Sequence, residues 1–307
     1  MFFLKSAILG FLSFGVSYIL TPLTIPLCKK IGAFDIPDGN RKINTTPTPR
    51  LGGLAFFAAS YLILFPLAES EPVIAAMLAG GAILCAGGVA DDSFGLSPFT
   101  KFLIQASAAI VSITLIGVPE RFSFFGIFNI ELWGFFGFLF TLGRMIFTIN
   151  AVNFSDGLDG LASGLSVTAL FSLFIYGTIN SSGYPAVGAL ILGFAVLGFL
   201  PYNKYHAKTF MGDCGSQFLG LSIALLSLGN SPSRSYSFET SLFLFIPAFD
   251  TLLSITRRLM KRKSPFAADK GHLHHILLKM GVPHPLAANL LIAASCTVAL
   301  LTLLFIV

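Results

Sequence analysis

The chain of 307 residues is 55% hydrophobic and only 11% charged, its mean hydropathy is +0.83, and its net charge is +5. A soluble domain of this composition would have too little polar surface to cover its exterior, so an integral membrane protein is expected. Nucleic acid is not expected as a partner, because the sequence contains no aromatic-rich soluble module that could bind it.

Apolar windows near the length of about 20 residues that crosses a bilayer occur repeatedly along the chain. The ten windows centre on Phe14, Ala59, Ile83, Ala109, Phe140, Leu170, Ile191, Ile223, Phe245 and Ala294. The sequence therefore predicts an all-α polytopic membrane protein, a single domain over residues 1–307 with about ten transmembrane helices. An even number of spans places both termini on one side. The first window is expected to be retained, because it lacks a small-residue cleavage site before Pro22.

The basic residues predict how the chain is oriented. All of the 19 Lys and Arg residues except Lys5, Arg121 and Arg234 lie in or beside the loops after the first, third, fifth, seventh and ninth windows. Short cytoplasmic loops hold the excess of positive charge, so these loops are predicted to be cytoplasmic and the termini external. No Glu lies on that side, where the acids are Asp35, Asp38, Asp91, Asp92, Asp156, Asp159, Asp213, Asp250 and Asp269.

The first of these loops, residues 31–53, contains three Pro and four Gly, which rule out a continuous helix. It is long enough to fold back over a site. Arg41 and Lys42 are candidates to bind a phosphate, or they only set the orientation of the chain.

The third window ends in GGVADDSFGLSP, which places Asp91 and Asp92 side by side at the cytoplasmic boundary. Adjacent carboxylates repel, and one tends to take up a proton unless a cation or a phosphate-binding Lys is near. The pair suits metal coordination or base catalysis. The alternative is a solvated acid pair that ends a helix before Gly95 and Pro98.

The run NAVNFSDGLDGLASG at residues 150–164 lies between two apolar windows. A carboxylate facing lipid costs roughly 2.5–3.5 kcal/mol, so Asp156 and Asp159 are expected to line an enclosed polar site or the membrane surface. Asn, Asp and Gly also favour turns, so a solvated loop is the alternative.

Two further loops contain candidate ligand-binding residues. In PYNKYHAKTFMGDCGS, glycines on both sides of Asp213 let the backbone approach a ligand and leave N–H groups available for phosphate. In the last loop, GHLHH invites a zinc interpretation, but His274 and His275 would point about 100° apart on a helix and no Cys or Glu accompanies them. A phosphate or sugar contact is favoured there, with an interfacial amphipathic stretch as the alternative. The four cysteines show no paired spacing and are expected to be reduced, buried thiols.

Five motifs follow one another along the chain: RKINTTPTPRLGG, GGVADDSFG, NAVNFSDGLDGLASG, FMGDCGS and GHLHH. In order and spacing they resemble the polyprenyl-phosphate N-acetylhexosamine-1-phosphate transferases, the membrane family that includes the bacterial initiators of lipid-linked glycans and the peptidoglycan translocase. The resemblance runs nearly end to end. It implies an enzyme of the bacterial cytoplasmic membrane whose active site, formed by the loops, faces the cytoplasm.

The resemblance also implies roles for individual residues. Carboxylates implied to be catalytic are Asp91, Asp92, Asp156 and Asp159. Asp213 resembles the principal Mg²⁺ ligand, with Asn153 beside it. The implied substrate-binding residues are Lys42, Asn203, Phe210, His272, His274 and His275. Among these, Asn203 and Phe210 would hold uridine, the latter by stacking, while Lys42 and the histidines would meet diphosphate or sugar.

The His-x-His-His form resembles the branch that uses UDP-N-acetylglucosamine or a related UDP-N-acetylhexosamine. The expected reaction transfers N-acetylglucosamine-1-phosphate to undecaprenyl phosphate and releases UMP. Another UDP-N-acetylhexosamine or UDP-MurNAc-pentapeptide is the alternative donor. Asn44 departs from this branch, whose members often have His there, which leaves the choice of sugar open. Whether the protein forms a homodimer is also left open.

The chemistry can be argued from charge alone. An anion must attack a diphosphate, so neutralisation of charge dominates the barrier, and Mg²⁺ is the expected cofactor, with Mn²⁺ as an alternative. Direct attack by the lipid phosphate is favoured over a covalent intermediate on Asp91 or Asp92. A proton-coupled transporter is a remote alternative, because its acids should lie at mid-membrane and only Asp250 does so here. A CDP-alcohol phosphotransferase would need further Asp residues where the chain is apolar.

Overall fold

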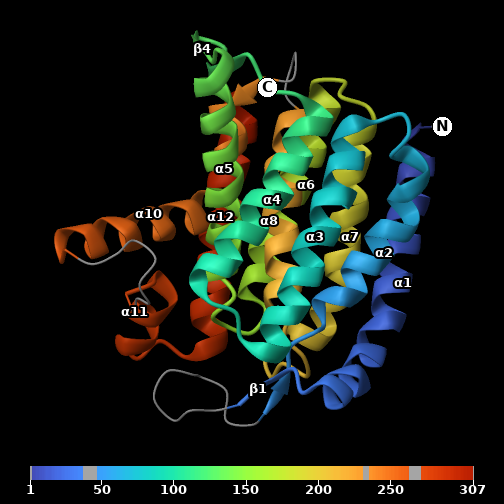
Figure 1. Ribbon diagram of the computed structural model, residues 1–307, viewed down its shortest axis with the longest axis vertical. Coiled ribbons are helices and arrows are strands. Elements are labelled where there is room, and N and C mark those ends of the chain that lie inside the picture. The colour runs from blue at the N-terminus through green and yellow to red at the C-terminus, as the bar shows by residue number, and fades with distance from the viewer. Residues whose placement is uncertain (1, 37–46, 231–234, 263–270, 307) are drawn as a thin grey trace.

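The computed structural model describes residues 2–36, 47–230, 235–262 and 271–306. They form a bundle of long helices with a small sheet at one end (Figure 1). The long helices of the bundle are α1 (Phe2–Ile31), α3 (Pro72–Phe94), α4 (Pro98–Ile116), α5 (Gly134–Phe154), α6 (Leu161–Ile179), α7 (Tyr184–Asn203), α8 (Gly212–Gly229) and α12 (His284–Ile306). The shorter ones are α2 (Gly53–Leu64) with the 3-10 turn η1 (Phe65–Leu67), α9 (Phe238–Leu242), α10 (Phe245–Met260) and α11 (Leu273–Lys279).

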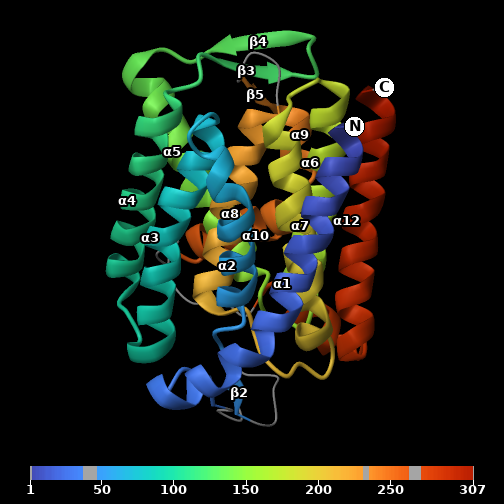
Figure 2. The same cartoon turned by 90° about the vertical axis from the view of Figure 1, so that its right-hand side faces the viewer.

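The two ends of the bundle differ. At one end, strand β3 (Arg121–Phe124) pairs antiparallel with β4 (Phe128–Glu131) and parallel with β5 (Tyr236–Ser237), and we call this the sheet end. At the other end, β1 (Phe34–Asp35) pairs with β2 (Thr48–Pro49) near the loops at residues 95–97, 154–160 and 204–211, and we call this the loop end. The start of α1 and the end of α12 both lie at the sheet end, as an even number of spans predicts (Figure 2).

Seven helices in the described part of the chain are long and apolar enough to cross a membrane: α1, α3, α4, α5, α6, α7 and α12. The all-α polytopic membrane fold is therefore confirmed, while the number ten stays a prediction. The three remaining windows correspond to α2, α8 and α10. Helix α2 has only 12 residues before η1 continues it, so it falls short of a full span by itself.

Helix α8 is not among the seven, because its polar residues lower its mean hydropathy. It can include them because it lies in the middle of the bundle. Every residue from Gly212 to Leu228 is buried, and α8 contacts α2, α3, α5, α6 and α7. A helix that no lipid touches can include polar residues such as Asp213 and Gln217, provided that they find partners inside the protein. The sequence of α8 is therefore less apolar than one would expect for a helix buried so deeply in the bundle.

Helix α10 departs from the predicted ninth span. The segment divides after α9, and α10 leaves the bundle and runs across the direction of the other helices (Figure 1). Its buried stripe is polar, with Asp250, Ser254 and Arg258, while Phe249 and Leu252 are exposed. This arrangement follows from the periodicity of about 3.6 residues that places Asp250, Ser254 and Arg258 on one stripe.

Glycines let the neighbours of α8 approach its backbone. A Cβ atom on Gly88 of α3 would collide with the backbone of Asp213 and Cys214, and one on Gly53 of α2 would collide with Gly215. Small residues at such crossings allow helices in a membrane to pack closely without a hydrophobic driving force. Three of the four cysteines, Cys28, Cys85 and Cys214, are buried as predicted, but Cys296 of α12 is exposed, beside Thr168 of α6.

The close crossing of α3 and α8 gives a prediction about stability. Gly88→Ala should destabilise the protein by about 1–3 kcal/mol, because the added methyl meets backbone that cannot move aside without displacing α8. Gly15→Ala in α1 is the matched control, since no atom lies within 4 Å of its added Cβ and Ala favours a helix. Thermal unfolding in detergent measures both. Equal melting temperatures for Gly88→Ala and wild type would contradict the tight crossing.

Candidate active site

Three buried carboxylates come together at the loop end. Asp91 and Asp92 lie in the last turn of α3 and Asp213 lies in the first turn of α8. An oxygen from each of the three lies within 4.8 Å of the others. The α3–α8 crossing at Gly88, one turn before the pair, sets this distance. The backbone N–H of Asp213 donates to Asp92 Oδ2 at 3.0 Å, which fixes the start of α8 against α3.

Two cations neutralise much of this charge. Lys101 Nζ lies 2.5 Å from Asp91 Oδ2 and 3.1 Å from Asp213 Oδ2, so it bridges the two helices. Ser97 caps α4 by accepting a hydrogen bond from the Thr100 N–H, which starts the helix one turn before Lys101.

The second cation is Arg50. Its Nε lies 3.2 Å from Asp92 Oδ1 and its Nη2 lies 3.7 Å from Asp213 Oδ1. Burial lowers the pKa of the Arg50 guanidinium, but the charges of Asp92 and Asp213 raise it by more, so the group stays charged.

Backbone pairing places Arg50 over the start of α8. The N–H of Phe210 donates to Pro49 O at 2.8 Å, and the N–H of Gly52 donates back to Phe210 O at 2.9 Å. Gly212 has a φ of +66°, and a side chain there would collide with the Arg50 carbonyl and with Asp92 Oδ2. The chain therefore needs Gly at 212 for both conformational and steric reasons.

A chain of amides holds Asp213 from the side of α5 and α8. Asn153 Nδ2 donates to Asp213 Oδ1 at 3.2 Å, and Gln217 Nε2 donates to Asp213 Oδ2 at 3.1 Å. Gln217 in turn accepts from Gln105 Nε2, and Gln105 accepts from Asn150 Nδ2. These contacts provide hydrogen bonds to most lone pairs of the Asp213 carboxylate. A carboxylate that is nine-tenths buried requires such partners.

The three carboxylates fit a divalent metal ion. With Arg50 and Lys101 opposite three Asp side chains, one formal negative charge remains uncompensated within the group. Asp92 Oδ1 is buried and accepts no hydrogen bond from the described residues, although Arg50 Nε lies near it. Clustered carboxylate oxygens are the ligands of Mg²⁺ and Ca²⁺. In the described chain this is the only cluster of three or more such ligands.

The central loop between α5 and α6 adds the other two predicted carboxylates. Burial raises the pKa of Asp156 to about 7, Arg50 opposes that rise, and the Asp213 charge adds to it. Asp159 Oδ2 accepts a hydrogen bond from the Ala207 N–H at 3.0 Å, which ties the central loop to the α7–α8 connection. Asp156 therefore lies close enough to the carboxylate group to be affected by its charges, whereas Asp159 holds two loops together.

The predicted uridine residues differ in their surroundings. Asn203 is buried, its Oδ1 accepts from Ser163 Oγ at 2.7 Å, and its Nδ2 donates to Thr209 O at 3.2 Å. Its amide thus joins α6, α7 and the following loop. Phe210 is half-buried beside the Pro49 backbone. Lys42 lies outside the described residues, as does Asn44.

The histidine segment lies against the central loop. Asp250 of α10 accepts from the Leu273 N–H and pairs with His272 Nδ1, each at 2.9 Å, and so fixes the start of α11. The His274 ring is buried and packs on Gly157, where a Cβ would collide with its Nε2. Burial lowers the pKa of His274 to about 3, and the neighbouring His275 adds to the effect. His275 is half-buried, with its ring 4.3 Å from that of His274.

Sequence reasoning missed several residues of the site. Arg50 and Lys101 were counted only as charges that set orientation, yet they contact the carboxylates directly. Asp250 was noted as an acid inside an apolar window, and its partner turns out to be His272. One signal in the sequence could have identified Lys101. It lies one turn into an apolar helix, and that helix directly follows the Asp91–Asp92 pair.

Comparison with known proteins agrees with this arrangement. The family model described as glycosyl transferase family 4 matches residues 74–230, which include all three carboxylates of the group. The decaprenyl-phosphate N-acetylglucosaminephosphotransferase of Mycobacterium tuberculosis is 37% identical over 91% of this chain and 77% of its own length. The probable undecaprenyl-phosphate N-acetylglucosaminyl 1-phosphate transferase of Bacillus subtilis is 36% identical, over 87% and 75%. The phospho-N-acetylmuramoyl-pentapeptide-transferase of Staphylococcus haemolyticus is 31% identical, over 89% and 91%.

The matched region begins in α3 and ends after α8, so it spans the helices that bring Asp91, Asp92 and Asp213 together. It covers half of the chain, and the relatives extend the similarity over most of the remainder. The chain belongs to glycosyl transferase family 4.

Proposed function

We propose that this protein transfers N-acetylglucosamine-1-phosphate from UDP-N-acetylglucosamine to undecaprenyl phosphate or another polyprenyl phosphate and releases UMP. The observation that supports it best is the buried group of Asp91, Asp92 and Asp213, with two cations beside it, at one end of an apolar bundle. Such a group suits the reaction of two phosphate-containing substrates, one of which is anchored in lipid. The names of the M. tuberculosis and B. subtilis relatives favour N-acetylglucosamine as the sugar.

Asp213, with Asp91 and Asp92, would hold Mg²⁺, and Asn153 would orient the Asp213 carboxylate. When bound, the ion would supply positive charge against the diphosphate of the donor. Lys101 and Arg50 are placed to bind phosphate oxygens on the same side, because both already contact the carboxylates. Asp156 suits proton transfer, since a carboxyl with a pKa of about 7 changes its charge near neutral pH.

A cavity supports the lipid part of the proposal. A space of about 620 Å³ lies along α5, α8, α9 and α10 and is lined mostly by apolar side chains, among them Phe140, Phe147, Leu244 and Leu252. Leu244, Ala248 and Leu252 at the start of α10 line one side of it, so we place it where α10 leaves the bundle and can meet lipid. We propose that part of the acceptor's prenyl chain occupies it, while the phosphate reaches the loop end.

We also propose that the loop end faces the cytoplasm in the bacterial inner membrane. Lys204 and Lys208 lie in the loop at residues 204–211 at this end, and Arg50 and Lys101 contact the carboxylate group itself. Arg144, counted with the same loops, instead lies inside α5 against Ser227 and Ser241. An excess of Lys and Arg is retained on the cytoplasmic side during insertion. A nucleotide donor is cytoplasmic, which agrees with this orientation.

The reaction is tested with purified protein, undecaprenyl phosphate, Mg²⁺ and a panel of UDP-sugars, with mass spectrometry of the lipid product. A lipid diphosphate bearing N-acetylhexosamine should form with UDP-N-acetylglucosamine, and removal of the metal with EDTA should abolish it. A parallel reaction with decaprenyl phosphate shows whether the protein also accepts a shorter polyprenyl phosphate. Product with UDP-MurNAc-pentapeptide alone, or none with any UDP-sugar, would contradict the proposal.

The role of Asp213 gives a second test. Asp213→Asn should lower turnover by orders of magnitude, because loss of charge stabilisation worth several kcal/mol costs a factor of ten for each ~1.4 kcal/mol. Glu120→Gln is the control, an exposed acid near the sheet end that should keep full activity. The melting temperature of both variants shows whether they fold. Near-normal turnover of Asp213→Asn at limiting Mg²⁺ would refute the assignment.

The buried His274 gives a prediction about pH. Its folded-state pKa of about 3 lies below the unfolded value near 6.5, so between these values the unfolded chain binds more protons. Stability should therefore fall as the pH drops from 7 towards 4, with a slope of up to about 1.4 kcal/mol per pH unit from this residue. His274→Gln should show a shallower fall in melting temperature than wild type, while His206→Gln, at an exposed position, should not. The same pH dependence in all three proteins would contradict a neutral, buried His274.

A further inference from the structure

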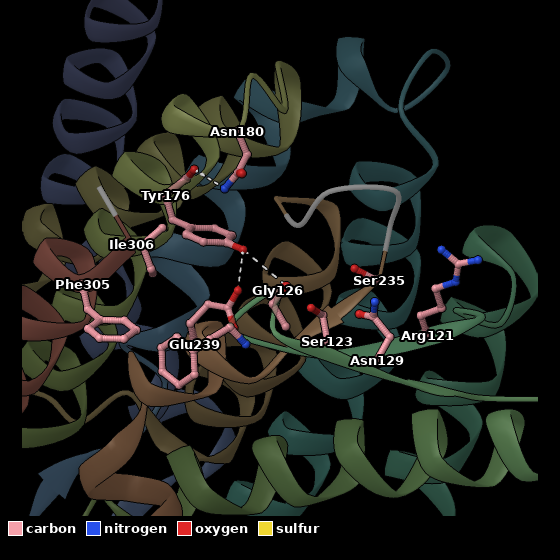
Figure 3. A pocket seen from close by; sticks show the side chains of 12 residues that line it. Arg121, Ser123, Gly126, Asn129, Tyr176, Asn180, Ser235, Glu239, Phe305 and Ile306 are labelled. Carbon is pink, nitrogen blue, oxygen red and sulfur yellow. Dashed lines mark hydrogen bonds between the residues drawn. The ribbon is translucent and has the colours of Figure 1, made fainter.

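A second cavity, with both polar and apolar walls, lies at the sheet end, at the opposite end of the bundle from the carboxylate group. Figure 3 shows the residues that line it. Its volume is about 390 Å³, and its walls come from β3, β4, β5, α6, α9 and the end of α12. Arg121, Ser123 and Phe125 alternate along β3 and its turn, so they line the cavity from one face of the strand. We call it the sheet-end pocket. The proposed transfer reaction at the loop end makes no use of it.

Glu239 is the feature of this pocket that calls for a ligand. Its side chain lines the cavity although the residue is only 7% exposed. Oε1 accepts from the Tyr176 hydroxyl at 3.3 Å and Oε2 accepts from the Phe125 N–H at 3.2 Å, as Figure 3 shows for the hydroxyl. Among the described residues, both donors to its side chain are neutral, and both bonds are long. A carboxylate buried at this depth is stabilised far better by a positive charge than by two such bonds.

The walls beside Glu239 are suited to an organic cation. The Phe125 and Phe305 rings meet edge to face with centroids 5.2 Å apart, and both line the pocket. An ammonium group binds favourably near aromatic rings when a carboxylate neutralises its charge. The hydroxyls of Ser123 and Ser237 line the same cavity and can accept hydrogen bonds from the other N–H groups of the ammonium.

The other side of the pocket bears positive charge. Arg121 lines it, is exposed, and pairs through Nε with Glu131 at 3.2 Å. A guanidinium presents five N–H donors, so this contact leaves others directed elsewhere. Arg121 is suited to bind a phosphate group, and the side-chain amide of Asn129 on β4 can donate a further hydrogen bond to it. The pocket therefore offers an acid at its inner end and a base at its rim.

The position of the pocket indicates where a zwitterionic ligand would come from. Tyr176 and Asn180 stand at the end of α6, and Phe305 and Ile306 at the end of α12, both of which are long enough to span a membrane. The ends of such helices lie at the level of the lipid headgroups. Phe305 is 72% exposed and lies between the pocket and the outer surface of α12. A headgroup could enter here while its acyl chains stay beside α12.

We propose that the sheet-end pocket binds a primary ammonium group on Glu239, supplied by the headgroup of an aminophospholipid whose phosphate lies against Arg121. The site is separate from the transfer chemistry. A small free amine offers the same ammonium chemistry without a lipid, so the source must be distinguished by experiment.

The test uses the full chain in detergent and native mass spectrometry, with lysophosphatidylethanolamine and lysophosphatidylglycerol as probes. Both contain a phosphodiester, but the ammonium group of the ethanolamine lipid is replaced by the uncharged hydroxyls of glycerol in the other. The ethanolamine lipid should bind saturably and at least roughly tenfold more tightly, as expected for one charge-assisted contact. Glu239→Gln should abolish that preference, while Glu120→Gln, which removes an exposed acid near the same end, should retain it. Equal binding of both lipids to wild type, or an unchanged preference in Glu239→Gln, would overturn the proposal.

A second variant separates ligand binding from a structural role of Glu239, which also joins α6, α9 and the β3–β4 turn. Asn129→Trp leaves Glu239 in place and fills the rim of the pocket from an exposed strand position. Binding of the ethanolamine lipid should be lost while the melting temperature stays unchanged. Full binding by Asn129→Trp would overturn the site. Displacement of the lipid by millimolar ethanolamine would show that the ammonium group alone suffices, whereas binding of ethanolamine without any binding of the lipid would overturn the lipid source.

Discussion

The burial of three carboxylates beside one another at the end of a membrane bundle is the constraint on which the rest of this structure depends. Each of them would be costly at this depth without partners. Their partners come from separate parts of the chain: Lys101 from α4, Arg50 from the position directly after β2, and Asn153 from α5. The site consequently exists only when the whole bundle is assembled, and no single loop can form it alone.

The glycines and the polar interior of α8 follow from this constraint. Asp213 can reach Asp91 and Asp92 only if α3 and α8 nearly touch, which requires Gly88 on one helix and a bare backbone on the other. Because α8 is surrounded by protein, Gln217 can sit inside it and hold Asp213. The same features that make α8 too polar for a lipid-facing span make it suitable as the central support of a charged site.

Hydropathy was sufficient to predict the fold class, and the Asp-rich motifs were sufficient to predict that the carboxylates of α3 and α8 lie at the same end of the bundle. Local sequence could not reveal which side chains meet. Arg50 and Lys101 looked like other basic loop residues, because their distances to Asp92 and Asp91 depend on packing between distant helices. The resemblance implied a uridine contact for Asn203, but not that Ser163 and Thr209 hold its amide. Its proposed contact with uridine stays a prediction, as do the roles of Phe210 and the histidines.

Helix α10 lies outside the bundle, but Asp250 ties it to His272 and to the first N–H of α11. His274 on that short helix rests on Gly157 of the central loop, three residues beyond the end of α5. Asp250 thus couples α10 to α11, whose histidine ring packs on the central loop. A displacement of α10 would therefore also move α11, and with it the imidazole that packs on the central loop.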